Sequence, residues 1–123
     1  MLNIENFWKD IISQNKEALP GYFSDDAVIR WHCTNEQFTK AEYIQANCEY
    51  PDNWSGEIER IEKTDNSIIL AGRVFPIDKS ESYHVVSFIK CEGDLIRELD
   101  EYWAYDGEPP AWRKNMKIGR TIQ

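Results

Sequence analysis

The chain has 123 residues, of which 41% are hydrophobic and 29% charged, and its formal net charge at pH 7 is −8. This length is typical of one domain, so we expect residues 1–123 to form a single domain. The acidic balance and the absence of any Lys/Arg run argue against nucleic acid or an anionic membrane surface as a partner, because both require a positively charged face.

The sequence favours a cytoplasmic protein. No apolar run approaches the roughly 20 residues that a membrane-spanning helix needs. The first residues have neither the basic start nor the apolar stretch of a signal peptide. Cys33, Cys48 and Cys91 are odd in number and make no CxxC or other metal-binding spacing. We therefore expect reduced, mostly buried thiols and no bound metal.

Two helices are predicted. The first has one apolar stripe at helical spacing, is capped by Asn3 and is expected to end at Pro20-Gly21; the stripe consists of Ile4, Phe7, Trp8, Ile11 and Ile12. The second opens with a capping box at Thr39-Lys40-Ala41-Glu42 and runs to about Cys48.

The remaining pattern is that of strands. Residues 27–33 alternate, with Ala27, Ile29, Trp31 and Cys33 on one face. From Trp54 onwards the period is again two, and short connections join the segments into an antiparallel meander. The four predicted strands are Trp54–Lys63, Ser67–Pro76, Ser82–Cys91 and Leu95–Tyr105. The tail at residues 108–113 is too rich in proline to continue the last strand.

This order of elements predicts an α+β fold, in which helices pack on one face of an antiparallel sheet. Because the strands are long, twist and coiling should curl the sheet around the helices. The curled end would then leave a cavity lined by inward-facing side chains.

Two local strings, in this order, resemble the SnoaL-like branch of the nuclear transport factor 2-like superfamily. The string Phe23-Ser24-Asp25-Asp26-Ala27-Val28-Ile29 is similar to the entry into the first strand of that fold. Glu92-Gly93-Asp94-Leu95-Ile96 and the later Asp100-Glu101-Tyr102-Trp103 resemble its last hairpin. Pro110-Ala111-Trp112-Arg113 looks like the tail of one uncharacterised subgroup.

The resemblance implies a cystatin-like α+β cone roll, built as a curved antiparallel sheet on N-terminal helices, and homodimerisation. The superfamily includes polyketide cyclases, ketosteroid isomerase, limonene-epoxide hydrolase, scytalone dehydratase and members that only bind ligands. A shared fold therefore leaves the function to be argued from the site residues.

Glu101 is the first candidate for proton transfer. On alternation, Arg97, Leu99, Glu101 and Trp103 share one face of the last strand, so the carboxylate lies between two apolar neighbours. Desolvation there would raise its pKa towards a range useful for an acid or base. The resemblance to limonene-epoxide hydrolase also aligns that enzyme's last-strand acid with Glu101. Alternatively, Glu101 is a solvated strand residue or part of an interface ion pair.

Three further charged or titratable residues are candidates. Arg73 lies among apolar neighbours and would need an anionic partner, either Glu101 or a ligand group; the alternative is an outward-facing surface arginine. His84 is a second candidate catalytic residue, with His32 less favoured. Tyr83 replaces His84 if the strand register is shifted by one residue.

Aromatic side chains are the candidate ligand-binding surface. The chain has five Trp, six Tyr and five Phe. Trp31, Trp54 and Trp103, with Leu99, would form cavity walls, and Tyr22 could close the mouth. Large rings bind flat apolar ligands by area burial and stacking, although the same rings also serve in cores and interfaces.

The chain departs from its better-known relatives. Ile29 and Trp31 occupy the positions of the tyrosine and asparagine that hold the water in limonene-epoxide hydrolase. Arg73-Val74-Phe75 lacks the aspartate of that enzyme's Arg-x-Asp pair. No counterpart of the ketosteroid isomerase tyrosine and aspartate set is found.

Two hypotheses remain. In the first, the protein binds a small apolar or aromatic metabolite and runs cofactor-free acid–base chemistry, of cyclase, isomerase or dehydratase type, with Glu101, His84 and Arg73. In the second, it is a non-catalytic homodimeric ligand-binding or interaction module. No nucleotide, metal or other cofactor motif is present in the sequence.

Overall fold

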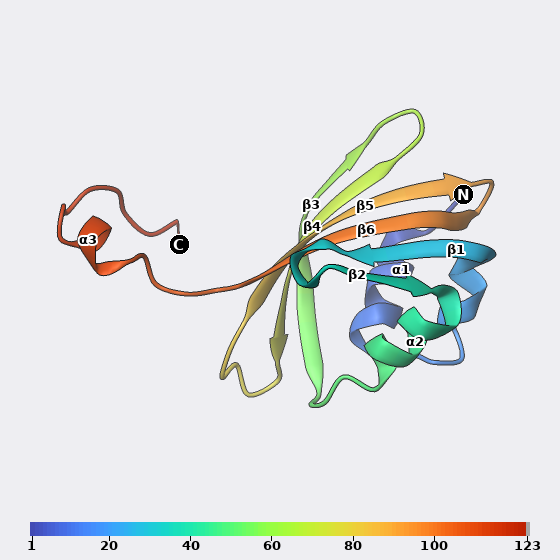
Figure 1. Ribbon diagram of the computed structural model, residues 1–123, viewed down its shortest axis with the longest axis horizontal. Helices are drawn as coiled ribbons and strands as arrows, with labels where there is room; N and C mark the ends of the chain where they lie inside the picture. The colour runs from blue at the N-terminus through green and yellow to red at the C-terminus, as the bar shows by residue number, and fades with distance from the viewer. Residues whose placement is uncertain (123) are drawn as a thin grey trace.

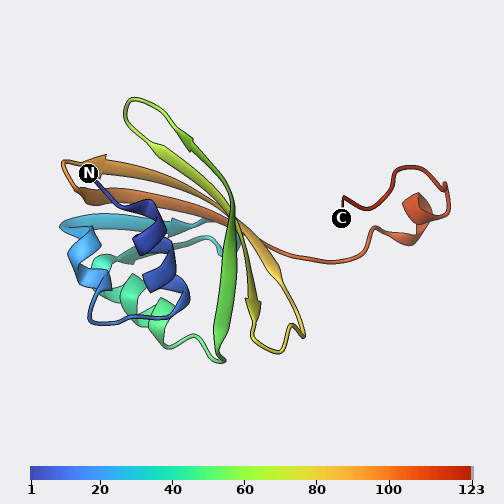
Figure 2. The same cartoon turned by 180° about the vertical axis from the view of Figure 1, so that it is seen from behind.

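The computed structural model describes residues 1–122, which contain one six-stranded sheet with α1 and α2 on one of its faces and α3 in an arm away from it (Figures 1 and 2). Along the chain, the elements are α1 (Ile4–Ile12), η1 (Leu19–Tyr22), β1 (Phe23–Trp31), η2 (His32–Thr34), β2 (Glu36–Thr39), α2 (Lys40–Cys48), β3 (Trp54–Lys63), β4 (Ile68–Pro76), β5 (Tyr83–Glu92), β6 (Leu95–Tyr105) and α3 (Ala111–Lys114). Within these residues, no helix is both long and apolar enough to cross a lipid bilayer.

Both predicted helices form, but the first is shorter than expected. Asn3 caps α1 by accepting a hydrogen bond from the backbone N–H of Asn6, and α1 ends at Ile12 rather than at Pro20-Gly21. Gln14 then adopts a φ of 56°, a left-handed conformation that ends a helix as a glycine would. The capping box of Thr39 and Glu42 is present at the start of α2.

The predicted antiparallel meander is confirmed, and the sheet order is β2-β1-β6-β5-β4-β3. Strand β1 runs parallel to β6 and antiparallel to β2. The short strand β2 was not predicted. The first strand begins at Phe23, earlier than expected, and ends at Trp31, so Cys33 lies in η2 and is exposed rather than buried on a strand face.

Two bulges shift the register of the meander. Lys90 pairs with Glu98 and Cys91 with Ile96, so Arg97 is an extra residue on β6. As a result Ile96 is buried and Arg97 exposed, which corrects the predicted grouping of Arg97 with Leu99. Strand β3 carries a similar extra residue, Glu59, between Ile58 and Arg60. A bulge reverses the alternation on one side of it, and the sequence pattern alone does not reveal it.

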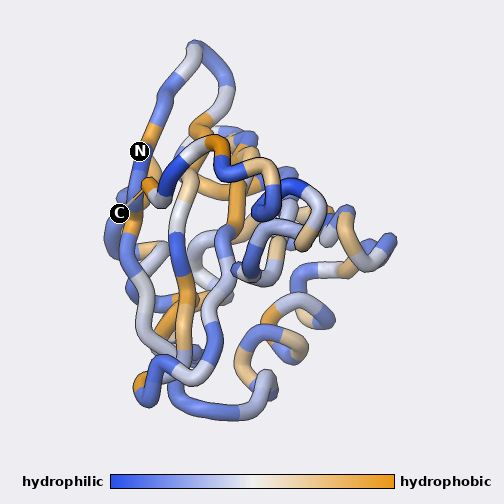
Figure 3. The backbone as a smooth tube through the Cα atoms, turned by 90° about the vertical axis from the view of Figure 1, so that its left-hand side faces the viewer, coloured by the Kyte–Doolittle hydropathy of each residue, from blue (hydrophilic) through white to orange (hydrophobic). Residues whose placement is uncertain are grey.

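The core lies between the helices and the sheet. Figure 3 shows hydrophobic and hydrophilic segments alternating along the chain, as expected for strands with one buried face. The ring of Trp8 from α1 lies against Gly72 on β4 and Gly56 on β3, where a Cβ at Gly72 would be 2.4 Å from the ring. Glycine at these positions lets the helix pack close to the sheet.

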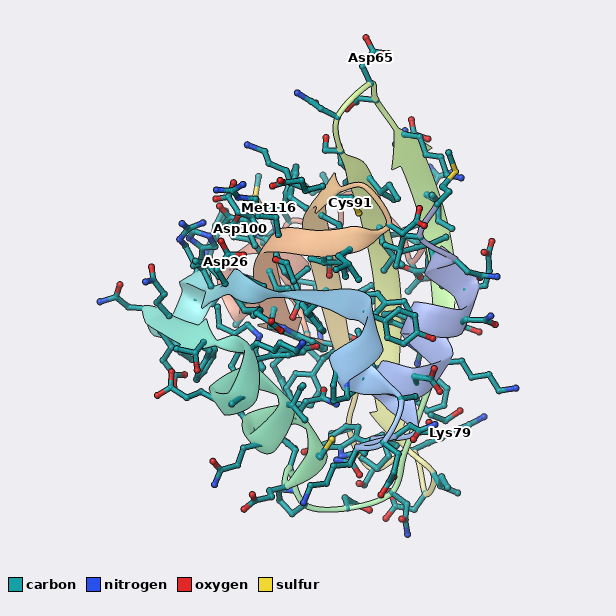
Figure 4. All side chains as sticks on the ribbon, turned by 90° about the vertical axis from the view of Figure 1, so that its right-hand side faces the viewer. Asp26, Asp65, Lys79, Cys91, Asp100 and Met116 are labelled. Atoms are coloured by element: carbon teal, nitrogen blue, oxygen red, sulfur yellow. The ribbon has the colours of Figure 1, made fainter. Side chains whose placement is uncertain are left out.

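The strands and the tail extend beyond the helices. Figure 4 shows Asp65 at the tip of the β3–β4 hairpin and Lys79 in the β4–β5 connection at the other end of the sheet. After β6 the chain leaves the body as an arm, residues 107–122, which contains α3 (Figure 1). Every residue of this arm is exposed, and in Figure 1 the arm lies away from the sheet and from α1 and α2.

Candidate functional site

A cavity of about 370 Å³ opens at the end of the cone where β6 leaves the sheet. Six of its lining side chains are aromatic: Trp31, Tyr50, Trp54, Tyr83, Trp103 and Tyr105. The others come from α1, the turn after it, η2, β2, α2 and β4; they are Ile11, Ile12, Gln14, Cys33, Thr34, Glu36, Asn47 and Val74. This size is in the range of small-molecule sites.

The aromatic wall is built from the ends of neighbouring strands. Trp54 begins β3 and Tyr83 begins β5, while Tyr105 ends β6. The ring centroids of Tyr50 and Trp54 are 5.6 Å apart, those of Trp54 and Tyr83 6.1 Å, and those of Tyr83 and Tyr105 5.3 Å. Rings in such tilted and edge-to-face contacts support one another, so the wall is a continuous packed surface.

Glu101 is buried, with only 4% of its surface exposed. The Ser87 hydroxyl donates to its Oε2 atom over 2.6 Å, and the Trp31 indole N–H donates to its Oε1 atom over 3.1 Å. Burial raises the pKa of Glu101, and the hydrogen bonds from Ser87 and Trp31 oppose that rise without cancelling it. The acid is thus held inside the protein by neutral donors.

The indole N–H of Trp103 lies close to the same carboxylate. It is near enough to lower the pKa of Glu101, yet among the described residues it is the buried side-chain polar atom without a hydrogen-bond partner in acceptable geometry. The N–H of Trp103 therefore acts on the carboxylate through its electrostatic field and not through a hydrogen bond. Tyr43, buried nearby, has a raised pKa because of its burial and, next, the charge of Glu101.

Glu101 does not itself line the cavity. Trp31 and Trp103 stand in the cavity wall, and Glu101 bonds to the indole of Trp31 and neighbours that of Trp103. The predicted wall residues Trp31, Trp54 and Trp103 all line the cavity, whereas Leu99 is fully buried in the core and does not.

Arg73 and His84 lie on the opposite face of the sheet, away from the cavity. Arg73 is 3.6 Å from Glu57 and 3.9 Å from Asp106, between guanidinium nitrogen and carboxylate oxygen. His84 bonds to Asp106 through Nδ1, and its Nε2 is 3.3 Å from Glu59. The hydrogen bond with Asp106 raises the pKa of His84, burial partly opposes this, and Glu59 adds to the rise. The structure therefore does not bring either residue to Glu101.

Two other candidates also lie elsewhere. Tyr22 packs against Phe7 at a centroid distance of 5.2 Å and donates its hydroxyl to Asp10 over 2.5 Å, away from the cavity lining. His32 is on the outer face, bonded to Asp100 and stacked on Tyr102 at 4.4 Å. Tyr83, the replacement considered for His84, lines the cavity.

Sequence reasoning missed several lining residues. Tyr105 continues the alternation of Leu99, Glu101 and Trp103, so extending that pattern by one step would have found it. Ser87, the donor to Glu101, lies on the same face of β5 as Val85 and Ile89, so alternation along that strand would have predicted its inward direction. Tyr50 carries no such signal, because it lies in the turn after α2 and reaches the cavity only through the path of the chain.

Nothing in the described part of the chain resembles a metal centre, since no group of three or more His, Cys, Asp or Glu side chains converges there. Of the lining residues, Glu36 is the one with a formal charge, and Thr34 donates to it over 2.7 Å. The cavity can therefore provide aromatic faces, tyrosine hydroxyls, the Asn47 and Gln14 amides and one carboxylate.

No protein-family model and no curated protein matches the chain. Solved structures do. A candidate ketosteroid isomerase from Kribbella flavida is 20% identical, with a TM-score of 0.81 over 98% of this chain and 87% of that chain. A ketosteroid isomerase-like protein from Catenulispora acidiphila, in complex with trimethylamine, is 14% identical, with a TM-score of 0.70 over 83% and 85%.

An epoxide hydrolase from M. tuberculosis is 11% identical, with a TM-score of 0.68 over 82% of this chain and 79% of that chain. Further matches are described as nuclear transport factor 2-like, from Burkholderia xenovorans, and SnoaL-like, from Shewanella putrefaciens. The resemblance drawn from the two sequence strings is thereby confirmed at the level of the fold. The chain has the α+β cone fold shared by nuclear transport factor 2-like, ketosteroid isomerase-like and SnoaL-like proteins.

Proposed function

We propose that the chain is a single ligand-binding domain that holds a small, largely apolar or aromatic-faced molecule in the cavity of the cone. The observation that carries this proposal is a 370 Å³ space with six aromatic walls. Rings that served only as core would fill that space, whereas here they border it. A structural neighbour of this fold was solved with trimethylamine, which supports a ligand-binding use of the fold.

A matched pair of substitutions tests the proposal. Val74 lines the cavity from β4, and Val86 lies on the outer face of β5. Val74→Phe should fill the cavity and abolish the thermal stabilisation given by aromatic and alicyclic compounds, while Val86→Phe should leave it intact. Equal loss in both variants, or no stabilisation of the wild type by any compound, would contradict a binding function.

Acid–base catalysis is the second candidate, and the raised pKa of the buried Glu101 favours it. Proton transfer requires contact between the acid and the bound molecule, and the indoles of Trp31 and Trp103 stand between them. Catalysis by Glu101 would thus need one indole to move on binding. Turnover of a bound compound that disappears in Glu101→Gln, with binding retained, would support this candidate over binding alone.

We also propose that the protein is a homodimer in the cytoplasm. The arm has one acidic residue, Glu108, and four basic residues, which are Arg113, Lys114, Lys117 and Arg120. The formal net charge of the whole chain, by contrast, is −8. The basic arm is therefore suited to the acidic body of a second copy. Its apolar residues Trp112, Met116 and Ile118 are 65%, 56% and 63% exposed.

Sedimentation equilibrium tests the dimer. Charge reversal of the four basic arm residues to Glu should yield monomers, whereas Lys90→Glu, on the exposed body, should not. A wild-type chain that stays monomeric would contradict the homodimer. The three cysteines are free in the structure, in keeping with a reducing compartment.

A further inference from the structure

The cavity lining combines many aromatic faces with no basic side chain. Trp31, Trp54 and Trp103 lie around it together with three tyrosines, and Glu36 is the charged group among them. The face of an aromatic ring carries partial negative charge and attracts cations. An anionic molecule would find no Lys or Arg in this lining to neutralise it.

The buried carboxylate behind the wall has no counter-ion. The hydrogen bonds that Glu101 accepts come from the neutral groups of Ser87 and Trp31, and no ion pair of the described residues includes it. A buried carboxyl group without a cationic partner favours its neutral form, because an unpaired charge in a medium of low dielectric constant is costly, and a cation nearby shifts the balance towards the carboxylate. The indoles of Trp31 and Trp103, which lie next to this acid, both line the cavity, so a cation bound in the cavity would lie across them from Glu101.

Neighbouring basic groups are already engaged elsewhere. Arg73 and His84 face the outer surface and pair with Glu57, Glu59 and Asp106. Arg30 pairs with Glu98 and Asp100, also outside. Among the residues that the structure describes, no Lys or Arg lines the cavity, so ring faces and the carboxylate of Glu36 border it.

From these two independent observations we propose that the cavity binds an organic cation whose positively charged nitrogen bears apolar substituents, such as an alkylated ammonium. The rings would contact the substituents and attract the charge. The bound cation would favour ionisation of Glu101, whose proton leaves to solvent, and the carboxylate would then supply the opposite charge across the wall. A bare metal ion does not fit, since it needs several oxygen, nitrogen or sulfur ligands that the lining does not bring together. This inference rests on the proposed ligand-binding function and names its ligand class.

Three probes of the same shape but different charge distinguish a cation-binding cavity from a neutral apolar pocket. They are choline, 3,3-dimethylbutan-1-ol, which replaces the charged nitrogen by carbon, and the anion 3,3-dimethylbutanoate. Binding is followed on the full chain by the NMR signals of the indole N–H groups of Trp31, Trp54 and Trp103. Choline should bind at least about tenfold more tightly than the alcohol, and the anion should not bind.

Equal affinities of choline and the alcohol would overturn the inference and leave a neutral binding pocket in place. Preferred binding of the anion would overturn it as well. No response to any of the three, up to their solubility limits, would count against the inference and against the proposed function together. The two failures are therefore distinguishable.

A substitution then locates the charge. Glu101→Gln removes the carboxylate but keeps groups that can bond to Ser87 and Trp31, so choline affinity should fall towards that of the alcohol while alcohol binding stays unchanged. Glu62→Gln, on the exposed end of β3, is the matched control and should alter neither. A Glu101→Gln variant that folds and binds choline like the wild type would overturn the role of Glu101. The comparison of probes on the wild type does not depend on that variant.

Discussion

The indole of Trp31 serves the cavity and the buried acid at once. Its N–H donates to Glu101 over 3.1 Å, while the tryptophan itself forms part of the cavity wall. The ring also packs edge-to-face on Phe38 at 4.8 Å, which holds it in place from the side of β2. A bound molecule that shifts this ring would therefore alter the hydrogen bonding of the acid behind it.

Removing this N–H should destabilise the fold. Trp31→Phe keeps an aromatic wall but deprives Glu101 of one of its two hydrogen bonds, so the free energy of unfolding should fall by about 1–3 kcal/mol. Trp103→Phe is the matched control, because it loses the same volume and an N–H that has no partner. Its loss should be clearly smaller in urea unfolding. Equal losses would mean that the hydrogen bond to Glu101 adds nothing beyond packing.

Burial of Glu101 predicts a specific dependence of stability on pH. Its pKa is raised in the folded protein above the ordinary 4.5, so at pH values between 4.5 and the folded pKa the folded state holds a proton that the unfolded state has lost. The stability that this group contributes is complete below about 4.5 and is lost as the pH rises through the folded pKa. The Glu101→Gln variant lacks this pH-dependent contribution to stability, because an amide does not titrate.

The measurement is the difference in free energy of unfolding between wild type and Glu101→Gln across pH. Wild type should lose stability relative to the variant as the pH rises above 4.5. The comparison cancels the contributions of Asp100 and Asp106, whose lowered pKa values act in the opposite direction in both proteins. A difference that is flat, or that grows in favour of wild type, would show that the acid is not desolvated.

On the outer face, the pKa of His84 should report its carboxylate neighbours. In an NMR titration it should lie above the ordinary 6.5 and fall in Asp106→Asn, because the hydrogen bond to Asp106 is the largest cause of its rise. Glu59→Gln should lower it by less. Since His84 is about half exposed, we expect the shift to shrink in high salt. If Glu59→Gln lowered the pKa of His84 more than Asp106→Asn did, Asp106 would not be the main cause of the rise.

Alternation predicted most of the sheet because a strand with one buried face has only two possible orientations. The bounds of β3 and β6 agree with those expected from the sequence, and Trp31, Trp54 and Trp103 reach the cavity. In strand β4, alternation did not show which face is buried. Ile69 and Phe75 surround Arg73 on one face while Leu70 and Val74 lie on the other, so both faces read as apolar.

Alternation also fails to predict the buried face wherever a β-bulge inserts an extra residue into a strand. The bulge at Arg97 moves Ile96 to the buried side, and only the pairing of Lys90 with Glu98 and Cys91 with Ile96 reveals it. Tyr50 and Glu36 reach the cavity from a turn and a short edge strand, whose positions depend on tertiary packing. The alternation therefore located the acid and the ring positions, but not which face His84 and Arg73 occupy.

The contact between Trp8 and Gly72 gives a last test, of the packing that keeps the helices on the sheet. A Cβ at Gly72 would be 2.4 Å from the Trp8 ring, so Gly72→Ala should cost about 1–3 kcal/mol of unfolding free energy despite the entropy that alanine saves in the unfolded chain. Gly21→Ala meets no atom within 4 Å and should be nearly neutral. Trp8→Leu should relieve the clash, so the double variant with Gly72→Ala should lose less stability than the two single losses combined. Strict additivity would mean that the ring is not what excludes a side chain from Gly72.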